Sequence, residues 1–293
     1  MARRLSVAAL IASAVWSAFP ASAQAYCRTT TCDPKLEDCR VDENGCTRTG
    51  APLTWRTLPI TYRFHAKGSK QLDRREAREA VRAAFARWSF VACGNGKRTS
   101  LRFEEGEDIS MTMPADPHHP AAQHFGIYFR DDEWTATDSD ATLALTTQSF
   151  KKINGWVEQS DIEVNTATAA FTTTDTAAGI DLQAVIAHEV GHYIGLAHSQ
   201  DPDSIMVDAY CKSGERCGNG KVDARKLSFD DENAVCALFP PEGISGVTYE
   251  EPDEGGCAVA PRGRTMPWLP FVGAAFVLAA LQRRVRRARA LDQ

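Results

Sequence analysis

Three histidines and a glutamate lie close together between residues 188 and 198. His188 and His192 are four positions apart within an apolar run of helical spacing, so both imidazoles project from one face of a helix. This separation suits two nitrogens at about 2.0–2.1 Å from one tetrahedral zinc ion. Glu189 points to the rim of the same site, where it can take a proton from a zinc-bound water. The pattern predicts metal-assisted hydrolysis, because zinc lowers the pKa of such a water to about 7.

A glycine and the third histidine follow the predicted helix. Gly195 tolerates a positive φ, which lets the chain leave the helix and turn back. We therefore expect His198 to be the third ligand, with the fourth position left open for catalysis. The alternative is an ordinary amphipathic helix, since His-Glu-x-x-His alone also arises by chance. Gly195, His198 and Met206 at their offsets make that interpretation the weaker one.

The motif His-Glu-x-x-His-x-x-Gly-x-x-His followed by Met206 resembles the metzincin metallopeptidases. Ser199 directly after the third histidine, Ser-Ile-Met at the methionine turn and Tyr210 four residues later resemble the matrixins within that clan. Astacins and serralysins tend to have a tyrosine two residues after the methionine, where this chain has Asp208. No tyrosine ligand to the metal is therefore expected.

The resemblance covers residues 52–240, which we predict to be the catalytic domain. It implies an α+β metzincin fold with a twisted, mostly parallel sheet, an antiparallel edge strand, an active-site helix, a methionine turn and a C-terminal helix. It also implies one catalytic zinc held by His188, His192 and His198, with Met206 beneath it. Glu189 would be the general base and then the proton donor to the leaving amine.

The elements that must position these residues are visible as patterns along the chain. Residues 55–64 alternate as in a strand, and residues 71–88 have apolar positions at helical spacing. Short strands are predicted at 101–103 and 108–113. This order resembles the upper subdomain of matrixins, and residues 160–165 resemble the buried strand before the active-site helix.

Residues 227–239 resemble the C-terminal helix of matrixins. Ser228 is the expected N-cap, with Asp231 at the third helical position. In matrixins the acidic pair matched here by Asp230 and Asp231 supports the methionine turn.

Residues 141–146, which include Leu143, Ala144 and Leu145, resemble the matrixin strand on the upper rim of the cleft. An edge strand with free backbone groups lets an extended peptide add to the sheet. An inner strand is the alternative, because sheet order is not visible in one sequence. Tyr210 is expected to shape the pocket wall on the primed side of the scissile bond. The loop between Cys211 and Cys217 would narrow that pocket if the two were bridged.

A Pro-rich loop carries His118, His119 and His124. Matrixins often hold a structural zinc through loop histidines and an aspartate, so a second structural Zn²⁺, or a Ca²⁺, is one hypothesis. A solvent-exposed loop without metal is the other, since the spacing does not match the family closely.

The length and composition of the chain exclude some classes of partner. With 293 residues and 43% hydrophobic content, it can bury one sizeable core with small appendages. A formal net charge of -5 gives no reason to expect nucleic acid as a partner. We expect a monomer that acts on proteins or peptides.

The N-terminus has the features of an exported protein. Residues 1–23 combine arginines, an apolar stretch and small residues, as in a secretory signal peptide. The chain has nine cysteines, and setting Cys257 aside leaves an even number for disulfides, whose connectivity the sequence does not reveal. Residues 24–51 hold four of them and form a disulfide-stapled segment or a short pro-segment. A zinc cluster is the rival interpretation, although no Cys-x-x-Cys pair is present there.

Matrixins are often kept latent by a free cysteine within an Arg-Cys-Gly sequence, which is absent from this chain. An unpaired cysteine in residues 24–51 is the remaining way to block the zinc by that route.

The C-terminus carries a second targeting feature. After a linker at 241–256, residues 257–293 contain Cys257, a short apolar run at 268–281 and an arginine-rich tail. This arrangement resembles the sorting signals of myxobacterial surface proteins, in which the tail is removed and the cysteine carries the anchor. A retained short transmembrane helix is the alternative. Either outcome associates the protein with a membrane at the cell surface.

Taken together, these features predict an exported zinc endopeptidase that is either secreted or anchored at the cell surface or outer membrane. One alternative is a zinc-bearing surface binding or adhesion domain with little turnover. Another is a zinc hydrolase that acts on non-peptide amides.

Overall fold

The structure is a computed structural model that describes residues 25–110 except 35, 125–135, 141–210 except 177, and 224–245. Several expectations lie outside these ranges and stay predictions. They concern the signal peptide, the C-terminal segment and the residues His118, His119, His124, Cys211, Cys217 and Cys257. Among the described residues, none of the helices combines the length and apolar character needed to cross a membrane.

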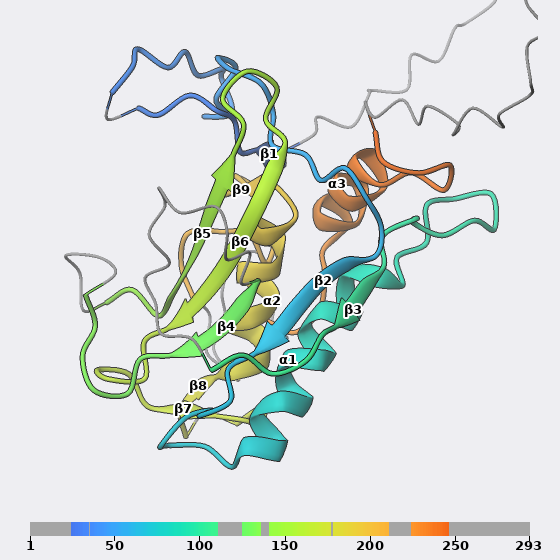
Figure 1. The fold of residues 1–293 in the computed structure, drawn as a ribbon. Coiled ribbons are helices and arrows are strands. Elements are labelled where there is room, and N and C mark those ends of the chain that lie inside the picture. The colour runs from blue at the N-terminus through green and yellow to red at the C-terminus, as the bar shows by residue number, and fades with distance from the viewer. Residues whose placement is uncertain are drawn as a thin grey trace, which may run out of the picture. The chain divides into compact units, whose positions relative to one another are not determined.

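Five strands form the central sheet in the spatial order β3-β2-β4-β6-β5 (Figure 1). They are β2 (Ile60–Phe64), β3 (Phe103–Glu105), β4 (Gly126–Phe129), β5 (Ala144–Phe150) and β6 (Val157–Val164). Neighbouring strands pair in parallel, except that β5 runs antiparallel to β6. The predicted mostly parallel sheet with an antiparallel edge strand is confirmed. The alternative of an inner strand at β5 is wrong.

The first long strand is shorter than the sequence pattern predicts. It begins at Ile60, whose backbone N–H donates to the carbonyl of Arg102 (2.8 Å), because Pro59 before it has no N–H to pair. The strand predicted at 101–103 starts two residues later, as β3. The one predicted at 108–113 is reduced, within its described part, to a single bridge between His65 and Ile109.

Two helices pack side by side behind the sheet in Figure 1, namely α1 (Arg74–Ser89) and α2 (Leu182–Tyr193). The helix predicted at 71–88 is confirmed with a later start, because Asp73 caps it by accepting hydrogen bonds from two backbone N–H groups. Trp88 of α1 donates its Nε1–H to the carbonyl of Ala187 in α2 (2.9 Å). The buried apolar residues of α1 are Ala77, Ala80, Val81, Ala84, Phe85 and Trp88.

Short elements lie before and after α2. The parallel pair β7 (Phe171–Thr172) and β8 (Ile180–Asp181) precedes it, and β9 (Leu196–Ala197) follows it. β9 pairs antiparallel with β1 (Cys27–Arg28) near the N-terminus. The chain after α2 is therefore held by a segment that is distant in sequence.

The last helix, α3 (Phe229–Leu238), begins at the predicted cap. Ser228 Oγ accepts from the backbone N–H of Asp231 (3.2 Å), and the Asp231 carboxylate accepts from the backbone N–H of Ser228 (2.7 Å). A disulfide from Cys93 to Cys236 joins the chain after α1 to this helix. One cluster of buried apolar side chains extends from the sheet through α1 and α2 to α3.

The four cysteines of the N-terminal segment all form disulfides, Cys27–Cys46 and Cys32–Cys39. The rival zinc cluster is therefore wrong, because none of these sulfurs is available to a metal. The same pairing leaves none of these four cysteines as a free thiol that could block the predicted zinc. Such bonds form and persist in oxidising compartments.

Candidate metal centre

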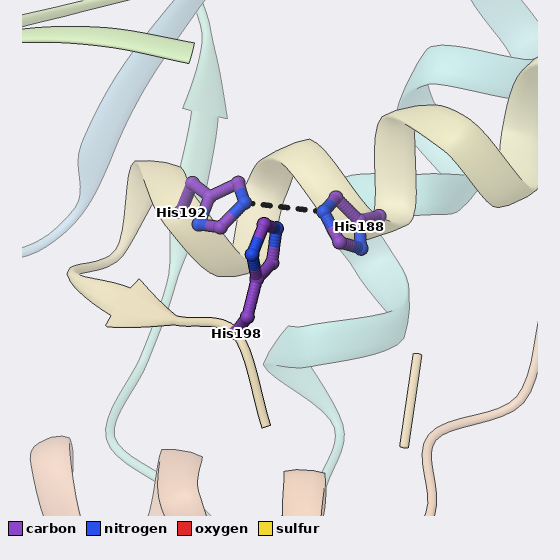
Figure 2. A group of neighbouring side chains, drawn as sticks. All are labelled: His188, His192 and His198. Carbon is purple, nitrogen blue, oxygen red and sulfur yellow. Dashed lines mark hydrogen bonds between the residues drawn. The ribbon is translucent and has the colours of Figure 1, made fainter. Parts of the chain in front are cut away.

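The helix α2 presents His188 and His192 on one face, as their spacing predicts. Their Nε2 atoms lie 3.1 Å apart, and the two ring planes are nearly perpendicular at 84°. Figure 2 shows these two nitrogens facing each other, while His198 approaches from the chain that follows the helix.

Gly195 turns the chain back toward the helix. Its φ is +100°, and a Cβ at this position would lie 2.9 Å from the carbonyl oxygen of Leu53. Glycine is thus required both for the backbone conformation and for the close approach of another segment. The turn places a ligand atom of His198 within 4.8 Å of those of His188 and His192, so the structure brings the three predicted ligands together.

Backbone carbonyls fix the orientation of two of the imidazoles. His188 Nδ1 lies 2.6 Å from the carbonyl oxygen of Ile205, and His192 Nδ1 lies 2.9 Å from that of Leu196. A carbonyl only accepts, so each Nδ1 carries the proton and each Nε2 presents a lone pair. Two such nitrogens bound to one tetrahedral zinc would be roughly 3.3 Å apart. The observed separation fits a cation between them.

The protonation of the histidines also suits metal binding. Burial lowers the pKa of His188 and of His192 to about 4 each, and it lowers the pKa of His198. All three imidazoles are therefore neutral at neutral pH. Neutral imidazole is the form that binds a metal ion.

Glu189 lies beside the cluster with its carboxylate held by a threonine of the edge strand. Thr146 Oγ1 donates to Glu189 Oε2 (2.6 Å). Burial raises the pKa of the Glu189 carboxyl, while the hydrogen bond from Thr146 opposes that rise. A dication at the histidines would oppose it further, because positive charge favours the carboxylate. Glu189 lines the same cavity as the three histidines.

Met206 is almost completely buried and lies against Gly191 of α2. A Cβ on Gly191 would lie 2.1 Å from the Met206 sulfur and 3.1 Å from the Trp88 ring. Gly191 therefore lets the methionine turn approach α2 closely. The backbone N–H of Ser199 donates to the Met206 carbonyl (2.8 Å), which joins the turn to the residue after His198.

The acidic pair of α3 holds the same turn. Asp231 accepts a hydrogen bond from the backbone N–H of Ile205 (3.0 Å) and another from the hydroxyl of Ser204. Asp230 accepts from Ser199 Oγ (2.7 Å) and from the backbone N–H groups of Ala25 and Tyr26 (3.0 Å each). The expected support of the methionine turn is confirmed for Asp231. Asp230 joins the N-terminal segment to the site as well.

A cavity of about 740 Å³ runs past the cluster. Its lining includes the three histidines and Glu189 together with the predicted pocket residues Leu143, Ala144, Leu145 and Tyr210. Within the described parts of the chain, β5 pairs only with β6, so its other edge is open. An open strand edge beside the three histidines can form backbone hydrogen bonds with an extended peptide.

A partly buried ion pair that sequence reasoning missed lies at the wall of this cavity. The Tyr210 hydroxyl accepts from the backbone N–H of Asp181 (2.8 Å), and Arg225 contacts the Asp181 carboxylate through Nε (2.5 Å) and Nη2 (3.0 Å). An aspartate directly before an apolar helical run is an N-cap signal, so Asp181 could have been found. No pattern of neighbouring residues in the sequence indicates the contacts that Arg225 and Thr146 make at this site.

The fold and the site geometry agree with a comparison to known protein families. The model of the family described as Matrixin matches residues 54–240, which is more than half of the chain. This chain belongs to the matrixin family. The matched range includes the three histidines, Glu189 and Met206.

Individual relatives of this matrixin are distant in sequence. Matrix metalloproteinase-C of Caenorhabditis elegans is 27% identical over 209 residues, which cover 66% of this chain and 31% of that protein. Human neutrophil collagenase is 26% identical over 170 residues, which cover 58% of this chain and 31% of the collagenase. Metalloendoproteinase 1-MMP of Arabidopsis thaliana is 25% identical over 198 residues, which cover 64% of this chain and 44% of that protein. The chain thus spans less than half the length of each of these relatives.

The arrangement of His188, His192 and His198 leads to a prediction for a zinc titration. The metal-free protein should bind zinc tightly, and His198→Ala should weaken this binding by more than the roughly 10–100-fold that loss of an outer partner of a ligand costs. Isothermal titration against a competing chelator measures both the affinity and the number of ions.

The matched control changes histidines elsewhere, in a variant carrying His118→Ala, His119→Ala and His124→Ala. The tight site should be unchanged in this variant. The loss of a second ion there would show that the loop also holds a metal. Tight zinc binding that survives in His198→Ala would contradict the three-histidine site.

Proposed function

We propose that this matrixin is a zinc-dependent endopeptidase that hydrolyses peptide bonds in proteins or peptides. The observation that carries the proposal is the cluster of three neutral histidines beside a buried carboxylate, in a cavity that follows an open strand edge. Three protein ligands leave a fourth position for reacting groups. When bound, zinc supplies Lewis-acid chemistry that makes water acidic near neutral pH and polarises a carbonyl oxygen.

The open edge of β5 supports binding of a peptide substrate. An extended peptide that adds to this edge forms backbone hydrogen bonds whatever its sequence, while alternate side chains point into pockets. Leu143, Ala144 and Tyr210 form part of a predominantly apolar cavity wall. We infer that the side chain that enters the cavity is apolar, because burial there removes its surface from water.

Glu189 would perform the proton transfers. Its carboxylate takes a proton as water attacks the peptide carbonyl, and it returns the proton to the amine that leaves. The Thr146 hydroxyl holds Oε2 in place by a hydrogen bond (2.6 Å). The strand that would bind the substrate thus also orients the proposed general base.

Replacing the base tests the proposal directly. Glu189→Gln keeps the size of the side chain but cannot take a proton at neutral pH, so peptide cleavage should fall by roughly 10²–10⁴-fold. The rate is measured with a quenched fluorescent peptide library, and the zinc content by mass spectrometry. Zinc should remain bound, and turnover close to that of the wild type would contradict the role of Glu189.

The contact between the edge strand and the base yields a second prediction. Thr146→Val keeps the shape of the side chain but removes the hydrogen bond, and a hydrogen bond to a charged group contributes about 1.5–3 kcal/mol. We expect kcat to fall by roughly 10–100-fold with zinc still bound.

Thr146→Ser, which retains the hydroxyl, is the matched control and should keep kcat close to the wild-type value. Separate kcat and KM values on one peptide distinguish orientation of the base from substrate binding. An unchanged kcat in Thr146→Val would show that the hydrogen bond does not serve the base.

The alternative of a surface-binding domain with little turnover has no specific observation in its favour. Such a domain would not need a carboxylate held beside the metal ligands by its own hydrogen bond. Zinc-dependent hydrolysis of a cell-wall amide panel but not of peptides would favour the non-peptide alternative.

We extend the proposal to an exported protein anchored through Cys257. The disulfides Cys27–Cys46, Cys32–Cys39 and Cys93–Cys236 support export, because such bonds persist outside reducing compartments. The intact mass of protein released from cells should lack residues 1–23 and everything after Cys257. A mass that includes the arginine-rich tail would contradict removal of that tail.

A further inference from the structure

One backbone carbonyl beside the metal cluster accepts two hydrogen bonds. The carbonyl oxygen of Leu196 lies 2.9 Å from Nδ1 of His192 and 3.0 Å from the hydroxyl oxygen of Thr29. Because this carbonyl determines which nitrogen of His192 carries the proton, it also determines that Nε2 faces the metal position. Thr29 belongs to the N-terminal segment, 167 residues earlier in the chain.

The rest of Thr29 is fixed to the same turn. Its backbone N–H donates to the carbonyl of Gly195 (2.9 Å), and its own carbonyl accepts from the backbone N–H of Leu53 (2.8 Å). Immediately before it, β1 pairs with β9, with Cys27 opposite Ala197. The turn between the second and third histidines is therefore held from outside by residues 27–53.

The two disulfides of the segment differ in whether they include a residue of β1, the strand that pairs with β9. Cys27 lies within β1 and is bonded to Cys46, so this bridge ties the strand that pairs with β9 to the rest of the segment. Cys32–Cys39 closes a shorter loop nested within residues 27–46, and neither of these two cysteines belongs to β1. Removing each disulfide separately therefore compares the loss of a bridge that includes β1 with the loss of one that does not.

We propose that the N-terminal segment is a permanent part of the metal centre, with Thr29 as a positioning residue. Its hydroxyl holds the Leu196 carbonyl, and that carbonyl holds His192. The segment therefore does not act as a removable pro-segment: its loss would weaken metal binding instead of opening the site. This inference rests on the metal cluster of the proposed function and is independent of peptide cleavage.

The experiment measures the zinc affinity of purified full-length variants by competition with a chelating dye. Thr29→Val keeps the shape of the side chain but loses the hydroxyl. The zinc Kd should rise by roughly tenfold, which is the lower end of the effect of removing a group that holds a metal ligand in place. Thr29→Ser keeps the hydroxyl and should remain within about twofold of the wild type. Thermal unfolding of the metal-free proteins shows whether Thr29→Val is folded.

Two double variants, each lacking one disulfide, keep the test decisive if Thr29→Val does not fold. The variant that carries Cys27→Ala and Cys46→Ala should bind zinc more weakly. The variant that carries Cys32→Ala and Cys39→Ala should bind zinc as the wild type does. Wild-type affinity in both Thr29→Val and the Cys27/Cys46 variant would overturn the inference, as would equal losses in Thr29→Val and Thr29→Ser. Failure of the wild type itself to bind zinc would overturn the proposed function and this inference together.

Discussion

The close approach of two imidazole nitrogens is the constraint on which the rest of this structure depends. The Nε2 atoms of His188 and His192 lie 3.1 Å apart. Two lone pairs facing each other at this separation are favourable only with a cation between them. Residues outside α2 orient both rings. The carbonyl of Ile205 in the methionine turn holds one, and the carbonyl of Leu196 after the helix holds the other. The orientation of these two histidines therefore depends on the two segments that supply the carbonyls.

Polar groups from both ends of the described chain hold those segments. Asp231 in α3 binds the backbone of Ile205, Asp230 binds Ser199, and Thr29 near the N-terminus binds Leu196. A buried carboxylate is costly unless several donors satisfy it, and each of these two carboxylates has several. Their hydrogen bonds therefore fix the backbone at specific places. This explains how a helix more than thirty residues beyond His198 contributes to the geometry of the metal ligands.

The same sheet edge joins substrate binding to chemistry in the function that we propose. β5 has an open edge for a peptide backbone, and its Thr146 orients the carboxylate of Glu189. On the cavity wall, Tyr210 is fixed by Asp181, the residue that also caps α2 and binds Arg225. A change in either contact would therefore affect the substrate site and the active-site helix together.

The sequence by itself determined those features that depend on backbone geometry over a few residues. The four-residue spacing of His188 and His192, the turn at Gly195 and the cap at Ser228 are of this kind, and the resemblance to matrixins supplied the mostly parallel sheet. Strand ends were less well determined, because pairing partners decide where a strand starts. Only the tertiary structure revealed the contacts from Thr146 to Glu189, from Arg225 to Asp181 and from Thr29 to Leu196, which join residues 43, 44 and 167 positions apart. Such contacts follow from the packing of whole elements against one another, and no local pattern in the chain records them.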